Sequence, residues 1–342
     1  MAKMTFNGQS QELKETQIVP TLHTPVEQGN NVVWCASILS AWKVLQNDIA
    51  GEPVELEDAN EHCTPLNEAD DPKNSMPAGA LYATAGWVQK GIIETIRDTI
   101  QKTFPTKEPP SFPGITDDSF LAYAYLEANV SFELPYFQNR QPFIFTDCSG
   151  DKTVVNSFGI RPEDDYAYFN LRNQPAILYT KRDAQYEPEE FAVDLCRNSE
   201  PSQIVLACTE PRKTLMETIS SLEQKIEASN HHEELDANDV LLVPDLFWQL
   251  AHDFGEFEGK LFRNTVLKGQ GMDVVRQDIL FRLDRSGAEL KSEAKQYCLP
   301  MPSHYLFDRP FLIYMKKRDA QSPYFAMWVS NGELLQPWNG KQ

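Results

Sequence analysis

The chain has 342 residues, of which 41% are hydrophobic and 11% aromatic, and its formal net charge is −19. A chain of this length and composition can bury one large core or two ordinary ones, so a disordered protein is excluded. The strong negative charge repels phosphate backbones and anionic lipids, so neither nucleic acid nor a membrane surface is an expected partner. No apolar run is long enough to cross a bilayer as a helix.

Residues 1–30 are polar and are expected to form an irregular N-terminal segment, followed by a single domain over residues 31–342. The stretch from Met1 to Asn7 lacks an apolar signal segment, so a cytoplasmic location is expected. The six cysteines are scattered without a Cys-x-x-Cys pair, and several lie in apolar runs. Buried reduced thiols are therefore expected, and neither a metal site nor a cofactor is predicted.

The first half of the chain is predicted to mix helices, strands and loops. The apolar run from Val32 to Leu45 has helical spacing and is expected to form a buried helix, with Asn30 or Asn31 as its N-terminal cap. Residues 51–78, rich in Pro, Glu and Asp, are expected to form a loop. Further elements are predicted as a strand over 80–90, an amphipathic helix with Ile92, Ile96, Ile100 and Phe104 on one face, and strands over 120–132 and 142–160.

The second half is predicted to be rich in strands. Two hairpins share the turn sequence Lys-Arg-Asp-Ala-Gln, at 181–185 and 317–321, each between apolar strands. Helices are expected over 211–228 and near 244–254, and a long strand over Val274–Leu283. Helices that come first and are followed by many strands predict an α+β fold.

Five segments resemble parts of the serpin family and occur in the family's order. Residues 274–289 are similar to the strand and hinge that open the serpin reactive loop, and residues 308–314 are similar to the family's Asp-His-Pro-Phe-Leu-Phe segment, with Arg309 in the His position. The other three segments are 83–91, 128–137 and 31–45, in which residues 31–33 followed by a helix over 36–45 are similar to the serpin strand that enters its first buried helix. The resemblance implies a serpin-like α+β domain, with several helices around a principal mixed or antiparallel sheet and a second sheet near the C-terminus.

The predicted hinge departs from that of an inhibitory serpin, which traps a protease by inserting its cleaved loop as a new strand of the central sheet. Small residues are required there, but this chain places Lys291, Glu293 and Lys295 after the hinge. Inserting them would bury charge at several kcal/mol each. About twenty residues separate Gly287 from Asp308, too few at ~3.3–3.6 Å each for a full inserted strand and a return across the molecule. The resemblance with these departures predicts a non-inhibitory, non-catalytic binding or scaffold protein.

The binding surface for an unknown protein partner is expected at the start of the short loop and just before the last strands. The residues concerned are Ala288, Glu289 and Leu290 in the loop, and Tyr305, Leu306 and Phe307 after it. The competing interpretation is that the aromatic side chains of this second group pack beneath the loop.

A papain-like cysteine hydrolase is the alternative prediction. Cys35 would be the nucleophile at a helix start, because a helix N-terminus lowers the pKa of a thiol. His304 would be the base, Asn331 would orient it and Gln28 would donate to the oxyanion. The papain Cys-Gly-Ser-Cys-Trp core is absent, and Gln28 is one residue farther from Cys35 than the motif requires. The competing interpretation of Cys35 is a buried thiol on an apolar helix.

Overall fold

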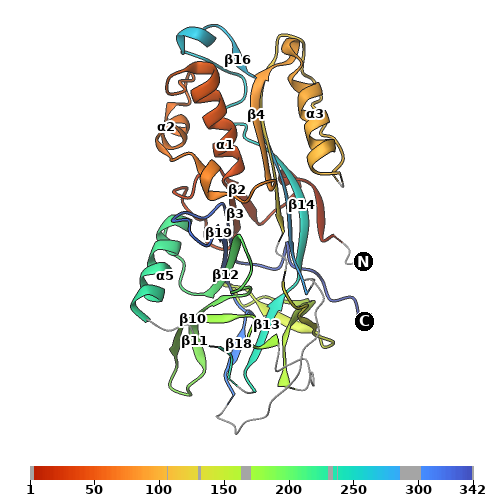
Figure 1. Ribbon diagram of the computed structural model, residues 1–342, viewed down its shortest axis with the longest axis vertical. Helices are drawn as coiled ribbons and strands as arrows, with labels where there is room; N and C mark the ends of the chain where they lie inside the picture. The colour runs from red at the N-terminus through yellow and green to blue at the C-terminus, as the bar shows by residue number, and fades with distance from the viewer. Residues whose placement is uncertain are drawn as a thin grey trace.

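The computed structural model describes residues 4–105, 107–129, 132–162, 171–229, 234–236, 238–285 and 302–340. Figure 1 shows the helices α1, α2 and α3 at one end of an elongated molecule, and α5 with a group of strands at the other. The bounds of these helices are α1 Ser37–Val44, α2 Asn60–Glu68, α3 Ile92–Thr103 and α5 Leu215–Ser229. No helix among the described residues is long and apolar enough to span a membrane.

The principal sheet, called the central sheet, has five strands in the order β1, β14, β17, β5, β4. Their bounds are β1 Phe6–Gln9, β4 Leu81–Trp87, β5 Phe120–Asn129, β14 Leu246–Asp253 and β17 Val274–Leu283. β5 and β17 run parallel, β4 and β14 are antiparallel to them, and β1 is parallel to β14. The sheet is therefore mixed, as predicted.

The second large sheet has seven strands in the order β10, β11, β12, β19, β20, β3, β2. These are β2 Thr16–Val19, β3 Asn31–Cys35, β10 Ala176–Arg182, β11 Pro188–Asp194, β12 Ser202–Cys208, β19 Phe311–Lys317 and β20 Phe325–Val329. Both predicted hairpins lie in it, and it holds the last two strands, which confirms the second sheet near the C-terminus. In the hairpin of β19 and β20, the pairing is continuous from Phe311 opposite Val329 to Met315 opposite Phe325.

A smaller sheet has four strands in the order β18, β13, β9, β6. Their bounds are β6 Phe137–Gln138, β9 Ser157–Ile160, β13 Val240–Pro244 and β18 His304–Leu306. Two-stranded pairs are formed by β7 Phe143–Thr146 with β8 Lys152–Val155, and by β15 Lys260–Leu261 with β16 Gly271–Met272. β18 is the first described strand after β17 in the sequence. The predicted loop therefore starts at the central sheet and ends at this smaller sheet.

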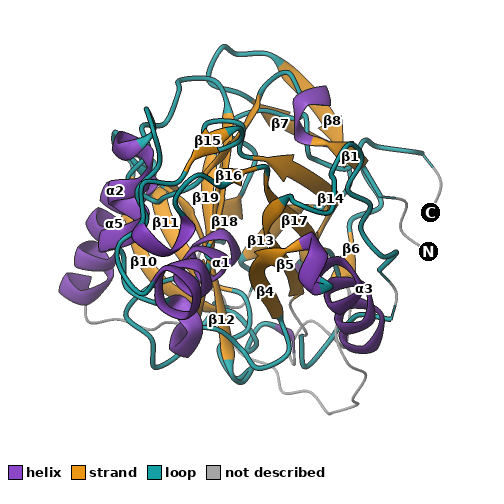
Figure 2. Ribbon diagram, turned by 90° about the horizontal axis from the view of Figure 1, so that it is seen from above, coloured by secondary structure: helices purple, strands orange, loops and turns teal. Residues whose placement is uncertain are grey.

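The central sheet is covered on both faces, as Figure 2 shows with α1 on one side and α3 on the other. Successive side chains of a strand point to opposite faces. On β5 the side chains that join the main core, beside α1, are Phe120, Ala122, Ala124 and Leu126. Those that join a second apolar layer, called the α3 layer, are Leu121, Tyr123 and Tyr125, packed with Ile96, Ile100 and Phe104. The prediction of an amphipathic helix over these isoleucines is confirmed.

The apolar run from Val32 to Leu45 is divided between a strand and a helix. β3 ends at Cys35, and α1 begins at Ser37 without a side-chain cap. Asn31 lies in the strand, where its buried side-chain amide donates to Asn331 Oδ1 at 2.7 Å. β3 pairs with β20 and β2, and an apolar run by itself does not distinguish a buried strand from a buried helix. The helix predicted from the apolar run and its asparagine cap are therefore wrong, whereas the strand followed by a helix that the family resemblance implies is confirmed.

Three other segments differ from their predictions. Residues 51–78 contain the helix α2, although Pro65 lies inside it. The segment near 244–254 is the strand β14 instead of a helix. Residues 1–30 contain β1, which pairs with β14, and β2, which pairs with β3. The prediction of an irregular segment is therefore wrong. The assignment of residues 31–342 to a single domain stays a prediction.

Candidate functional site

The boundary between β5 and β17, called the seam, lies beside β17, the strand from which the chain enters the predicted loop. The two strands pair in parallel over nine residue pairs, from Val274 opposite Leu121 to Arg282 opposite Asn129. The chain leaves the sheet at Leu283, and the predicted hinge residues Gly287, Ala288, Glu289 and Leu290 lie outside the described residues. The geometry of the seam itself can therefore be described, but not that of the loop.

Both faces of the seam are occupied by buried side chains. On β17, Val275, Ile279 and Phe281 belong to the main core, which continues the pattern of β5. Val274 and Leu280 pack on the opposite face against the α3 layer. A strand placed between β5 and β17 would consequently have a covered layer on each of its two faces.

A buried ionic cluster lies on the α3 side of the seam. Asp278 of β17, with its side chain 1% exposed, lies 3.1 Å through Oδ2 from Nζ of Lys107, which is 8% exposed. Arg276 Nε donates to the other carboxylate oxygen at 3.0 Å, and the Tyr123 hydroxyl of β5 donates to Oδ2 at 3.3 Å. Burial, together with the charge of Asp278, raises the pKa of Tyr123 far above its usual value. Tyr123 therefore remains a neutral hydrogen-bond donor to the carboxylate.

Lys107 belongs to residues 104–119, which join α3 to β5 and are called the strap. The strap contacts both strands of the seam. Its Phe104 and Phe112 rings pack edge-on against tyrosines of β5, at centroid distances of 4.6 and 5.6 Å. Lys107 binds Asp278 of β17, and the carbonyl of Ser111 accepts a 3.5 Å hydrogen bond from Arg276. Parting the seam would require one of these two sets of contacts to break.

A second buried carboxylate lies near the point where the chain leaves β17. Asp245, between β13 and β14, is 7% exposed, and its Oδ2 accepts a 2.9 Å hydrogen bond from Gln138. Its Oδ1 is buried and has no hydrogen-bond partner within the part of the chain that the structure describes. Burial, together with the charge of Asp284, raises the pKa of Asp245 to about 7, although the hydrogen bond from Gln138 and the charge of Arg285 lower it. This carboxyl therefore titrates near neutral pH, close to the last described residues before the loop.

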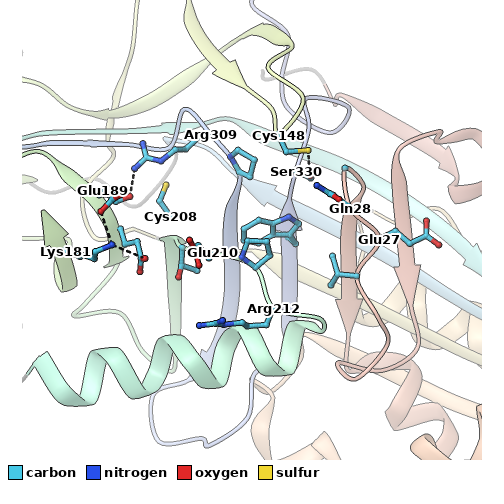
Figure 3. A pocket seen from close by; sticks show the side chains of 17 residues that line it. Glu27, Gln28, Cys148, Lys181, Glu189, Cys208, Glu210, Arg212, Arg309 and Ser330 are labelled. Atoms are coloured by element: carbon cyan, nitrogen blue, oxygen red, sulfur yellow. Dashed lines mark hydrogen bonds and ion pairs between the residues drawn. The ribbon is translucent and has the colours of Figure 1, made fainter. Parts of the chain in front are cut away.

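The pocket in Figure 3 has a volume of about 560 Å³ and lies over the second large sheet. Cys208 and Trp328 line its floor, and its rim carries charges of both signs. Several of these charges bind one another or the backbone: Lys181 Nζ lies 2.9 Å from Glu189 Oε2, and Arg309 Nη2 donates to the Glu189 carbonyl at 2.8 Å. The mixed rim does not select one class of ligand by charge.

The four residues of the hydrolase alternative each make a different contact. Cys35 is fully buried with its Sγ 3.0 Å from Ser37 Oγ, and burial raises its pKa to about 11. His304 belongs to β18 of the four-stranded sheet, and its Nδ1 lies 3.0 Å from Glu187 Oε1. Asn331 donates to the carbonyls of Glu15 and Gly29, and Gln28 lines the 560 Å³ pocket.

This geometry does not support the predicted activation of Cys35. The start of α1 lies inside the core, so loss of hydration outweighs any effect of the helix terminus and the thiol stays protonated. Within the described residues, no group of three or more His, Cys, Asp or Glu side chains could hold a metal ion.

The aromatic residues that were candidates for a partner surface belong to the core. Tyr305 is 2% exposed and Phe307 is fully buried. Their rings pack edge-on against Phe191, at centroid distances of 5.3 and 5.0 Å. Leu306, between them, is half-buried and lines a shallow pocket with His304. Tyr305 and Phe307 thus stabilise the packing between the smaller and the larger sheet and do not form an exposed binding surface. The competing interpretation, in which they pack beneath the loop, stays a prediction, because the loop lies outside the described residues.

These observations define the class of fold: an α+β domain with a central mixed sheet, covered by helices on both faces, and a C-terminal hairpin in a second sheet, which is the serpin architecture. No protein-family model and no curated protein matches the sequence. Solved structures do match. Human glycosylated kallistatin superposes with a TM-score of 0.56 at 13% identity, over 89% of this chain and 92% of that one. Protease nexin-1, crystallised with heparin, gives 0.53 at 8% identity, over 88% and 92%.

Both of these proteins are serpins, so the chain has a serpin-like fold, as the sequence resemblance implied. Identities this low carry the fold and nothing of the activity. The sequence interpretation missed the ionic cluster of the seam. A signal for it was present, because Asp278 directly precedes the apolar run Ile279-Leu280-Phe281 within the predicted strand, where a carboxylate must find a partner.

Proposed function

We propose that this chain is a serpin-fold binding protein whose loop does not act as a protease-trapping spring. The observation that carries the proposal is that the seam is covered on both faces. Lys291, Glu293 and Lys295 alternate in the sequence, so an extended strand would present all three on one face. Whichever way that strand turned, the three charges would enter the main core or the α3 layer. Burying an unpaired charge costs several kcal/mol after relaxation.

Chain length adds a second restriction, which applies to the uncleaved chain. β17 ends at Leu283 and β18 begins at His304, so residues 284–303 make the whole connection. A strand as long as the seam would use about ten of these twenty residues at ~3.3 Å each, and the return would use as many again, which leaves none for the turn between them. Cleavage within the connection removes this restriction. In the cleaved chain, the buried charges are what oppose insertion.

Two measurements test the proposal directly. The protein is incubated with trypsin, chymotrypsin and elastase, with an inhibitory serpin as the positive control, and SDS-resistant complexes are sought by electrophoresis. Thermal unfolding is also compared before and after limited proteolysis within 290–302. We expect no complex, and a melting shift under about 3 °C, which corresponds to roughly 1 kcal/mol in a chain of this size. A trapped protease, or a large rise in melting temperature, would overturn the proposal.

A charge-free variant tests the physical reason. K291A/E293A/K295A removes the three charges, and S292A is the matched control because it changes an uncharged residue between them. After cleavage, the triple variant is expected to melt at least about 5 °C above the cleaved wild type, whereas S292A should not. Equal melting temperatures for all three cleaved proteins would contradict the role given to these charges.

The binding role is tested separately by pull-down with the full chain and with a 290–302 deletion. A partner that is lost on deletion would place the interface on the loop, as the sequence predicts for Ala288, Glu289 and Leu290. A partner that is retained would place the interface on the folded body. Since Tyr305 and Phe307 are core residues, alanine substitution there should lower stability and is not a test of binding.

A further inference from the structure

The strand β4 is the outermost strand of the central sheet, and among the described strands it pairs with β5 alone. Figure 2 shows it at the end of the series β14, β17, β5, β4. Its sequence, Leu-Tyr-Ala-Thr-Ala-Gly-Trp, contains neither a charge nor a proline. Charged residues and prolines are the usual means by which proteins prevent an edge strand from pairing with another chain. β4 therefore lacks these protections over its whole length.

The register determines which backbone groups of β4 point outward. The Glu127 N–H donates to the Ala80 carbonyl, and the Val88 N–H donates to the Ser119 carbonyl. In an antiparallel pair, residues that bond the partner strand alternate with residues whose backbone groups point away. The even-numbered residues from 80 to 88 therefore bond β5. The residues whose N–H and C=O groups point away from β5 are Leu81, Ala83, Ala85 and Trp87.

These outward groups have no backbone partner among the hydrogen bonds of the described residues. The first part of the strand, from Leu81 to Thr84, is half-buried and so reaches solvent, whereas Ala85 is 8% exposed. Two of the four outward residues are alanines, whose small side chains leave the backbone open to approach. The edge thus offers a row of donors and acceptors at the spacing of a β-ladder.

We propose that the β4 edge binds an extended basic peptide, which adds to the central sheet as a sixth strand. Addition of a strand uses main-chain hydrogen bonds for affinity, and the outward groups of β4 provide them, beginning with Leu81 and Ala83 in the part that reaches solvent. The inference rests on the proposed binding function and names its surface and the kind of partner. Net charge selects the occupant. Each copy of the chain carries −19, so pairing of two β4 edges is opposed by repulsion, whereas a basic segment is attracted.

The variant that tests the edge is A83P/A85P. Proline has no N–H, so it removes two outward donors, and it is tolerated on an edge strand where the N–H does not bond the sheet. The ladder to β5 is retained. The matched control is T84P, because Thr84 is predicted to bond β5 through its N–H. T84P should therefore lower the melting temperature more than A83P/A85P does, which checks the register independently of any ligand.

The probe is a phage library of random dodecapeptides, panned against the immobilised full-length chain at low salt. Enriched peptides are expected to be basic. Fluorescence anisotropy should show binding at least about tenfold weaker to A83P/A85P, and weaker again when the peptide's lysines are replaced by glutamate. Hydrogen exchange at the amides of Leu81 and Ala83 should slow when peptide is added. Absence of enriched peptides, or equal affinity for wild type and A83P/A85P, would overturn the proposal.

A second measurement covers the case in which A83P/A85P does not fold. Each enriched peptide is synthesised with N-methyl groups on its even or on its odd residues. Because alternate residues of an added strand bond the edge, one of the two sets should abolish binding to the wild type and the other should not. Equal effects of both sets, or a wild-type dimer with slow exchange at Leu81 without peptide, would refute the basic-peptide occupant. Protease trapping would refute the proposed function without changing these results.

Discussion

Removing the carboxylate of Asp278 is predicted to destabilise the fold strongly. This side chain is 1% exposed. Its carboxylate forms ion pairs with Lys107 and Arg276 and accepts a hydrogen bond from the Tyr123 hydroxyl. D278A would leave two cations in a largely buried site without their counter-charge. Breaking a buried ion pair by removing one partner costs about 3–5 kcal/mol. We therefore expect D278A to lower the free energy of unfolding by about that amount.

The assay is urea denaturation followed by intrinsic fluorescence, analysed by linear extrapolation. K107M is expected to cost less than D278A, about 2 kcal/mol, because Asp278 keeps its contacts with Arg276 and Tyr123. In the double variant K107M/D278A the two losses should not add, with a coupling energy of about 1–3 kcal/mol. The m-values should remain equal if the variants share one native and one unfolded state.

A surface pair supplies the matched control. Lys181 Nζ and Glu189 Oε2 lie 2.9 Å apart, slightly closer than Lys107 and Asp278, but their side chains are 52% and 54% exposed. K181M should cost less than about 1 kcal/mol, because water and salt screen an exposed pair. If D278A cost no more than K181M, the carboxylate would not be holding the strap to β17, and the argument from buried charge at the seam would fail.

The remaining predictions concern two buried titratable groups. Burial raises the pKa of Asp245 from 3.8 to about 7, so its contribution to stability is full below pH 3.8 and is lost as pH rises through 7. D245N should therefore be more stable than the wild type at pH 8, by roughly 4 kcal/mol, and close to it at pH 4, measured by urea titration at each pH. A pH-independent difference would contradict the assignment. Burial raises the pKa of Cys35 to about 11, so iodoacetamide at pH 7.5 should label the exposed Cys148 and spare Cys35 until urea is added, as read by peptide mapping. Labelling of native Cys35 would reopen the hydrolase alternative.

The elements that sequence patterns predicted well are those whose period or turn is unambiguous. β17 has the predicted bounds, and α3 places Ile96 and Ile100 in its buried layer as four-residue spacing requires. The two hairpins followed from their shared turn sequence. The segments of β3 and β14 were predicted to be helices, because a continuous apolar run fits the periodicity of a buried strand as well as that of a buried helix. For both strands, pairing with partners distant in the sequence decides the conformation, as with Leu246–Asp253 against β17.

The site was less accessible from the sequence than the fold. The seam could be anticipated because the family resemblance names the strand that precedes the loop. The contact of Lys107 with Asp278 could not, since it joins residues that only the path of the strap brings together. Tyr305 and Phe307 show the opposite difficulty. An aromatic cluster beside a loop suits either an interface or a core, and only the packing against Phe191 decides between them.

The central sheet offers two places where an extra strand could pair, and their physical costs differ. Entry at the seam must separate β5 from β17 by about 4.8 Å, the spacing of neighbouring strands, and must release the strap from one of them. It must also place Lys291, Glu293 and Lys295 in a covered layer. Addition at the β4 edge separates no strands and leaves the ionic cluster intact, because the outward groups of Leu81 and Ala83 already face away from the sheet. The same sheet that opposes insertion from within therefore favours addition at its edge, which is why we infer recognition of an external strand in place of insertion of the chain's own.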